Sequence, residues 1–300
     1  MKLSGLHLLL TYQCTFECDH CFVWGSPFQN GVMTLKDIRE ILRQAQETGT
    51  ISSIYFEGGE PFLYYQVLVQ GMREAVQQGF QAGIVTNAYW ATSPEDAQEW
   101  LRPLAGLVSD LTVSSDLYHY SQEHSQQAEN ARLAAEALGI PLGTISVAQP
   151  EAVNAAEAVG QLPLGGSAVM YRGRATEELI CRAKRYPWEE FTTCPHEDLR
   201  EPGRVHLDPF GNLHICQGIS LGNLFRTPLK AICEAYDPEA HPVTGPLLRG
   251  GPAELARMHD LAPVHGALYA DACHLCYATR RALRSRFPEV LVPEGMYGIF

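Results

Sequence analysis

The chain has 300 residues, of which 46% are hydrophobic, so it can bury one large core or two moderate ones. Its net charge of −12 disfavours a nucleic-acid backbone as the main partner, because phosphate binding depends on Lys and Arg. No apolar run approaches the roughly 18 residues that span a bilayer, and the N-terminus lacks a signal-peptide pattern. The protein is therefore expected in the cytoplasm and not in a membrane. The cytoplasm is reducing, and clustered thiols there, such as those among the nine cysteines, usually bind metal.

The first part of the chain alternates short apolar strands with helices. Thr34 with Asp37 predicts a capping box, and Ser93 before Pro94 predicts a second helix start. Helix ends are expected at Gly49, Gly79, Gly139 and Gly160. Nearly continuous apolar strands separated by helices predict a right-handed parallel α/β array. The expected strands are Leu6–Thr11, Ser53–Phe56, Ala82–Thr86, Asp110–Ser114, Leu142–Ala148 and Ser167–Tyr171.

Beyond Cys181 this alternation stops and prolines become frequent. Val205–Asp208 and Leu213–Ile215 predict a β-hairpin, and Leu229–Tyr236 and Asp271–Arg286 predict helices. A basic group in the last helix is expected to be a solvated face, with a role beside a metal cluster as the alternative. Its members are Arg280, Arg281, Arg284 and Arg286.

Three cysteines follow the first strand on one short loop, Cys14, Cys18 and Cys21, in the spacing C-x3-C-x2-C. Three thiolates can hold three corners of a [4Fe–4S] cube and leave one iron open for chemistry. The alternative is a zinc clip that uses His20 as the fourth ligand.

The cysteine loop resembles the cluster motif of radical S-adenosylmethionine (radical SAM) enzymes. The segment Gly58-Gly59-Glu60 after the second strand looks like the glycine-rich motif with which that family holds the methionine amino group of SAM. The resemblance implies a partial (β/α)6 TIM-like barrel over residues 1–180, followed by a small α+β cluster-binding extension over residues 181–300. In such folds, sites gather at the carboxyl ends of the strands.

Further polar residues stand at those strand ends. By resemblance, Thr86 and Asn87 lie near SAM, and Ser114 or Asp116 reaches its ribose or carboxylate. His119 is a candidate for proton transfer near the substrate, against a structural histidine. In a segment that resembles the family's G-R-A element, Arg172 or Arg174 is a candidate carboxylate clamp, against a surface ion pair.

A second cysteine set occupies the last third of the chain: Cys194, Cys216, Cys273 and Cys276. The set resembles the Twitch form, a truncated SPASM extension of radical SAM proteins. That resemblance implies a second, auxiliary [4Fe–4S] cluster held by these four thiolates. A zinc ribbon built from the same thiolates is the alternative.

The resemblance implies reductive cleavage of SAM to a 5′-deoxyadenosyl radical, which abstracts a substrate hydrogen atom, and a flavodoxin- or ferredoxin-type electron donor. An auxiliary cluster then favours net oxidation, either dehydrogenation or cross-linking. A redox-neutral epimerase with Cys181 or Cys233 as hydrogen donor is the main rival. Activation of a glycyl-radical enzyme and a non-catalytic zinc or iron–sulfur interaction module are further alternatives. The substrate is expected to be a small molecule or a peptide presented by a separate partner protein.

Overall fold

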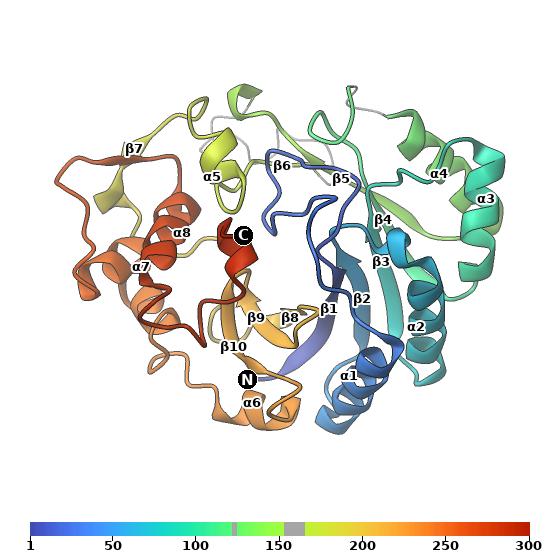
Figure 1. The fold of residues 1–300 in the computed structure, drawn as a ribbon, viewed down its shortest axis with the longest axis horizontal. Helices are drawn as coiled ribbons and strands as arrows, with labels where there is room; N and C mark the ends of the chain where they lie inside the picture. The colour runs from blue at the N-terminus through green and yellow to red at the C-terminus, as the bar shows by residue number, and fades with distance from the viewer. Residues whose placement is uncertain (122–124, 153–165) are drawn as a thin grey trace.

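A nine-stranded sheet organises the protein, with neighbours in the order β10-β9-β8-β1-β2-β3-β4-β5-β6 (Figure 1). The computed structural model describes residues 1–121, 125–152 and 166–300. All neighbours from β8 through β1 to β6 are parallel, whereas β9 is antiparallel to both of its neighbours, β8 and β10. The strands of the first half are β1 Leu3–Thr11, β2 Ser53–Gly58, β3 Gln81–Thr86, β4 Val108–Ser114, β5 Leu142–Val147 and β6 Gly166–Ser167. Those of the second half are β8 Gly203–Leu207, β9 Asn212–Cys216 and β10 Ile219–Asn223, with β7 Tyr186–Pro187 and β11 Leu268–Tyr269 forming a separate pair.

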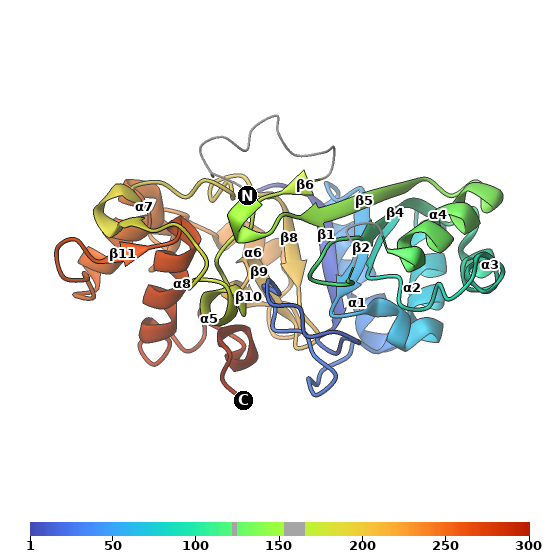
Figure 2. The same cartoon turned by 90° about the horizontal axis from the view of Figure 1, so that it is seen from above.

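Helices connect the parallel strands and lie outside them, so the chain has the expected α/β partial-barrel architecture (Figures 1 and 2). Thr34 forms the predicted capping box with Asp37, and Ser93 caps the next predicted start. The α-helices are α1 Leu35–Thr48, α2 Tyr65–Gln77, α3 Pro94–Leu101, α4 Gln126–Leu138, α5 Ala175–Glu178, α6 Leu229–Ala235, α7 Thr244–Met258 and α8 Ala272–Leu283. Helices α7 and α8 lie at the opposite side of the molecule from α2 and α3 in both views.

The two faces of the central strands differ in chemistry. Outward-facing residues such as Leu8 and Phe56 are fully buried in one hydrophobic cluster with Ile41 of α1. The residues at the alternate positions of the same strands, such as His7 on β1 and Tyr55 on β2, are polar and line a cavity inside the barrel. The helices therefore cover an apolar outer face, and the polar inner face is left for a ligand.

The C-terminal third of the chain contributes a strand that pairs with the first strand. The predicted hairpin forms as β8 and β9, and β8 pairs with β1 in parallel register, with His206 opposite His7. Val205 and Leu207 pack into the same hydrophobic cluster as β1. The hairpin thus extends the barrel sheet, and the division at residue 180 stays a prediction.

Two elements differ from the expected ones. Strand β6 has two residues, Gly166–Ser167, where Ser167–Tyr171 was expected. The sequence also gave no indication of α7, because Gly250 and Gly251 break its helical geometry and Pro252 begins its second half. The helix ends at Gly49, Gly79 and Gly139 are confirmed, whereas Gly160 lies outside the described residues.

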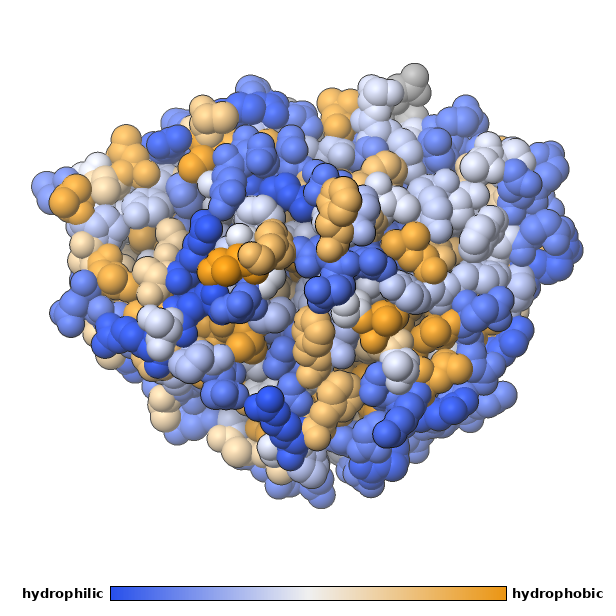
Figure 3. All heavy atoms as spheres, viewed as in Figure 1, coloured by the Kyte–Doolittle hydropathy of each residue, from blue (hydrophilic) through white to orange (hydrophobic). Residues whose placement is uncertain are grey.

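Hydrophobic residues are spread over the molecular face in Figure 3 as separate patches among hydrophilic ones. Phe28, Val264 and Phe300 are the most exposed large hydrophobic side chains among the described residues. No helix in the described part of the chain is long and apolar enough to cross a bilayer.

Candidate active site

A chamber of about 850 Å³ occupies the barrel interior and reaches from the cysteine loop down to the start of β1. It collects most of the residues that the sequence singled out. Those lining it are Cys14, Cys18, Cys21, Gly58, Gly59, Thr86, Asn87, Ser114, Asp116, His119 and Arg172. Five different strand ends supply these side chains, as the rule for parallel sheets predicts.

The first cysteine loop surrounds its sulfurs with hydrogen-bond donors. The backbone N–H of Gly25 donates to Cys21 Sγ at 3.1 Å, and that of Phe16 donates to Cys14 Sγ at 3.5 Å. The Asn87 amide adds a third donor, 3.5 Å from Cys14 Sγ. Burial raises the pKa of Cys14 to about 12 and that of Cys18 above its usual value, so these thiols need a bound cation to ionise.

The segment after β6 packs against this cysteine loop and forms hydrogen bonds with it. Arg174 is buried and donates to the carbonyl oxygens of Cys18 at 2.9 Å and Gly25 at 2.8 Å. Gly173 has φ +61° and a Cβ there would lie 2.5 Å from Cys21 O. The Arg174 guanidinium therefore positions the loop and is not available as a carboxylate clamp in the chamber.

The glycine-rich turn after β2 lies in close contact with the loop. A Cβ on Gly58 would lie 2.4 Å from Thr11 O, and one on Gly59 would lie 2.0 Å from Gln13 O. Only glycine permits this approach of two backbones. Both glycines line the same chamber as the cysteines, and the Gly59 N–H donates to Thr11 O at 2.7 Å.

The Glu60 side chain is buried and is not among the described residues that line the chamber. Its fully buried carboxylate accepts hydrogen bonds from Thr86 Oγ1 at 2.9 Å, the Asn87 N–H at 2.8 Å and the Phe62 N–H at 3.0 Å. Burial raises the pKa of Glu60 to about 7, although these hydrogen bonds oppose the shift. Glu60 thus joins the end of β2 to the end of β3.

Asp116 and His119 form a hydrogen-bonded pair that lines the chamber, with 2.8 Å between Asp116 Oδ1 and His119 Nδ1. Burial acts to raise the pKa of Asp116, but the hydrogen bond and charge of His119, the charge of His20 and the Val147 N–H together lower the pKa below its usual value. His20 packs on Tyr118 with 4.5 Å between ring centroids, and burial lowers its pKa to about 4.

All four cysteines of the second set line one small internal cavity of about 20 Å³, together with Arg172 and Arg280. They come from the segment after β7, the end of β9 and the first turn of α8. Burial raises the pKa of Cys194 to about 11 and those of Cys273 and Cys276 above their usual range. The structure therefore assembles the predicted set from three distant segments.

Arg172 lies between the two cysteine sites and lines both cavities. Its Nη1 donates to Cys216 Sγ at 3.4 Å and lies 3.5 Å from Glu197 Oε1, while its guanidinium lies over the Phe22 ring at 5.4 Å. The expectation of a wholly solvated basic face is wrong for Arg280. That residue is 1% exposed and donates to Gln217 O at 2.8 Å beside the second cysteine set, because the helix turns this face inward.

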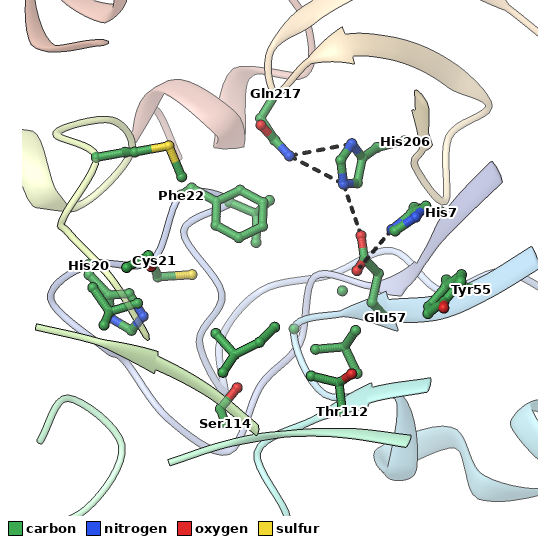
Figure 4. Close-up of a pocket in the computed structure, with 18 of the residues that line it drawn as sticks. His7, His20, Cys21, Phe22, Tyr55, Glu57, Thr112, Ser114, His206 and Gln217 are labelled. Carbon is green, nitrogen blue, oxygen red and sulfur yellow. Dashed lines mark hydrogen bonds and ion pairs between the residues drawn. The ribbon is translucent and has the colours of Figure 1, made fainter. Parts of the chain in front are cut away.

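Neither proposed hydrogen donor of the epimerase alternative reaches the chamber. Cys181 is exposed, and Cys233 lies in α6 within the main hydrophobic cluster. Sequence reasoning missed three inward-facing residues that the structure brings together, His7, Glu57 and His206 (Figure 4). Polar residues at alternate positions of otherwise apolar strands were the signal that could have found them.

Comparison with known proteins agrees with this geometry. Residues 8–133 match the family described as "Radical SAM superfamily". The protein named "Putative peptide biosynthesis protein YydG" from Bacillus subtilis (strain 168) is 33% identical over 122 residues, which are 40% of this chain and 38% of that protein. The tungsten-containing aldehyde ferredoxin oxidoreductase cofactor-modifying protein of Pyrococcus furiosus is 32% identical over 111 residues, 37% of this chain and 30% of the relative.

Among solved structures, native anSMEcpe with bound AdoMet superposes with a TM-score of 0.53 at 12% identity, covering 95% of this chain and 97% of that one. This likeness shows a common fold. The segment that matches the radical SAM family, residues 8–133, lies in the first half of the chain. The matched segments span less than two fifths of the length of either curated relative.

Proposed function

We propose that the protein is a radical SAM oxidoreductase that binds two [4Fe–4S] clusters and carries out a net oxidation of its substrate. The observation that carries this proposal is the second thiol site. Four cysteine thiols line one cavity, and Arg172 joins that cavity to the chamber that holds the first three cysteines. An electron acceptor there would lie at the wall of the substrate chamber.

The chamber residues of the cysteine loop and the glycine turn fit the cofactors of the radical SAM family. Three thiols with aligned N–H donors suit a four-iron cluster with one open iron, held by Cys14, Cys18 and Cys21. The glycine turn leaves backbone groups of Gly58 and Gly59 accessible to an amino acid portion of SAM. Ser114 and Asp116 are the candidates for its ribose or carboxylate.

The spacing of the thiols favours clusters over zinc at both sites. Tetrahedral zinc with Zn–S bonds of about 2.3 Å holds its sulfurs roughly 3.8 Å apart. Within the described residues, which include all nine cysteines, no three cysteine sulfurs lie within 4.8 Å of one another. A four-iron cube spreads its thiolates more widely, because each binds a different iron.

When bound, SAM and the first cluster supply the 5′-deoxyadenosyl radical that removes a substrate hydrogen atom, and the second cluster supplies an acceptor for one electron. The chain's own residues position the substrate and take up a proton. A substrate carbon that has lost a hydrogen atom completes its two-electron oxidation by losing one electron and one proton. His119, oriented through Nδ1 by Asp116, is the candidate to receive that proton at Nε2.

The substrate is a small molecule or a peptide. The chamber volume of about 850 Å³ lies at the upper end of the range for small-molecule sites, which leaves room beside SAM for a side chain or a compact substrate. Likeness to a protein named for peptide biosynthesis favours a peptide side chain. A reduced flavodoxin or ferredoxin is the proposed electron donor.

Anaerobic reconstitution with iron and sulfide, followed by dithionite and SAM, tests the proposal. We expect about eight iron and eight sulfide per chain, and 5′-deoxyadenosine in the chromatogram. The C14A/C18A/C21A variant should keep about four iron and form no 5′-deoxyadenosine, whereas Cys273→Ala should lose about four iron and still cleave SAM.

Cys181→Ala is the matched control, because this exposed cysteine belongs to neither set. Its iron content should equal that of the wild type. Zinc in place of iron at the second set would contradict the auxiliary cluster, and SAM cleavage by the triple variant would contradict the first assignment.

A further inference from the structure

The chamber also holds a second group of potential ligands, distinct from the three cysteines. His7 lies on β1, Glu57 on β2 and His206 on β8. The register of these adjacent parallel strands places His206 and Tyr55 opposite His7, and Glu57 follows Tyr55 by two residues on the same face. The three side chains therefore meet on the inner wall, where Figure 4 shows them pointing toward one another.

The distances among the donor atoms suit one metal ion. His206 Nε2 lies 3.0 Å from Glu57 Oε1, and His7 Nδ1 lies 3.4 Å from Glu57 Oε2. One ligand atom from each of the three residues fits within a mutual separation of 4.8 Å. Two nitrogen or oxygen ligands bound at about 2.1 Å to a single ion lie roughly 3.0–3.4 Å apart, which matches both contacts.

Neighbouring side chains hold the imidazoles in place. The His7 ring stacks on Tyr55 with 4.8 Å between centroids and 10° between planes, and Tyr55 OH donates to Asp110 Oδ2 at 3.0 Å. Gln217 Nε2 lies 3.4 Å from the His206 ring nitrogens. These contacts restrict the orientation of both imidazole rings.

One buried oxygen at this place lacks the hydrogen bond that such an atom normally makes. Gln217 Oε1 has no hydrogen-bond partner among the described residues, whereas Glu57 Oε1 is paired only with His206 Nε2. The group His20, Asp116 and His119 offers a contrast with similar composition. There Asp116 accepts from the backbone N–H groups of Tyr118 and Val147 as well as from His119, so its carboxylate already has a structural task.

We propose that His7, Glu57 and His206 bind one divalent transition-metal ion, with its open positions facing the chamber. Two imidazoles and one carboxylate are a ligand set that suits Zn²⁺ or Fe²⁺ and leaves sites for water or substrate. The ion would take a carboxylate, hydroxyl or carbonyl oxygen of the substrate at the end of the chamber opposite the cysteine loop. This inference does not depend on the proposed oxidation.

Zinc binding by the cluster-loaded full-length chain tests the inference, because loading occupies the cysteines. After anaerobic dialysis against chelator-buffered Zn²⁺, we expect one zinc per chain by elemental analysis. His7→Asn, His206→Asn and Glu57→Gln should each weaken zinc binding at least about tenfold. His265→Asn, at an exposed histidine 2.8 Å from Glu189, and His119→Asn should bind zinc as the wild type does.

X-ray absorption at the zinc edge of the wild type gives an answer that does not require any variant to fold. Nitrogen and oxygen neighbours at about 2.0–2.1 Å, with no sulfur, are the expected first shell. A sulfur shell, no retained zinc, equal zinc binding by all variants, or loss confined to His119→Asn would each overturn the inference.

Discussion

The Arg172 guanidinium donates a hydrogen bond to Cys216 Sγ, 3.4 Å away, and so connects the chamber wall to the second thiol site. Both the ring of Phe22 and the carboxylate of Glu197 contact the same guanidinium. The residue that the sequence suggested as a cofactor clamp thus touches a proposed cluster ligand. Its positive charge stands where an added electron would be stabilised.

Replacing Arg172 with Gln should make the second cluster harder to reduce. Loss of a charge-assisted hydrogen bond, about 1.5–3 kcal/mol, corresponds to a midpoint potential lowered by on the order of 100 mV for one electron. A potentiometric titration followed by EPR measures the shift. Arg204→Gln is the matched control, because Arg204 is half exposed and lies 4.0 Å from the same Glu197. Equal potentials in wild type and Arg172→Gln would contradict the expected coupling.

Replacing Arg174 with Ala should release the first cysteine loop. Two buried charge-assisted hydrogen bonds to carbonyl oxygens are lost, which should cost about 3 kcal/mol or more. We expect a lower thermal midpoint and about four fewer iron atoms per chain after reconstitution. Arg281→Ala removes an exposed ion pair with Glu177 and should change stability by less than about 0.5 kcal/mol. Wild-type iron content in Arg174→Ala would show that the loop holds its shape without it.

Replacing Gly59 with Ala, which adds one methyl group, should weaken SAM binding. The new Cβ would overlap Gln13 O at 2.0 Å, so the turn after β2 must move away from the loop. Equilibrium dialysis with labelled SAM should show affinity reduced more than about tenfold. Gly143→Ala on β5 adds the same atom with nothing closer than 3.8 Å and should leave SAM binding unchanged. If both variants bind SAM equally well, the glycine turn is not part of the cofactor site.

Deprotonation of Glu60 should lower the free energy of unfolding as pH rises toward neutrality. Its folded-state pKa of about 7 lies above the ordinary value of 4.5, so the folded protein holds this proton more tightly than the unfolded chain does. The contribution is complete below pH 4.5 and is lost between there and about pH 7. Glu60→Gln should have a flatter thermal midpoint between pH 5.5 and 8, and a parallel decline in both proteins would argue against this assignment.

Local patterns were enough to predict the parallel strands and many of the chamber residues, whereas the choice of a barrel came from the family resemblance. The loop with Cys14, Cys18 and Cys21 and the turn at Gly58 and Gly59 are contiguous motifs at strand ends, and periodicity locates the strands. The second cysteine set was also identified, although its segments meet only in the folded chain.

Other features depend on contacts that no local pattern specifies. Glu60 belongs to the predicted motif, yet its side chain turns back to Thr86 because only buried donors can satisfy it there. The placement of His206 beside His7 needs the pairing of β8 with β1, and Arg280 became buried through the packing of α8. Helix α7 was missed because its glycines and prolines interrupt the helical period.

The pairing of Leu3 with Gly203 has a consequence for biosynthesis. During translation, one edge of the first strand has no partner until the ribosome has delivered about two hundred more residues. Such a distant closure is slow, since a long loop must be ordered before its contacts form. The Met1 amino group is held later still, by Cys233 O at 2.9 Å. We therefore expect the nascent chain to need protection of that edge, and His206 to join His7 and Glu57 only after β8 has been synthesised.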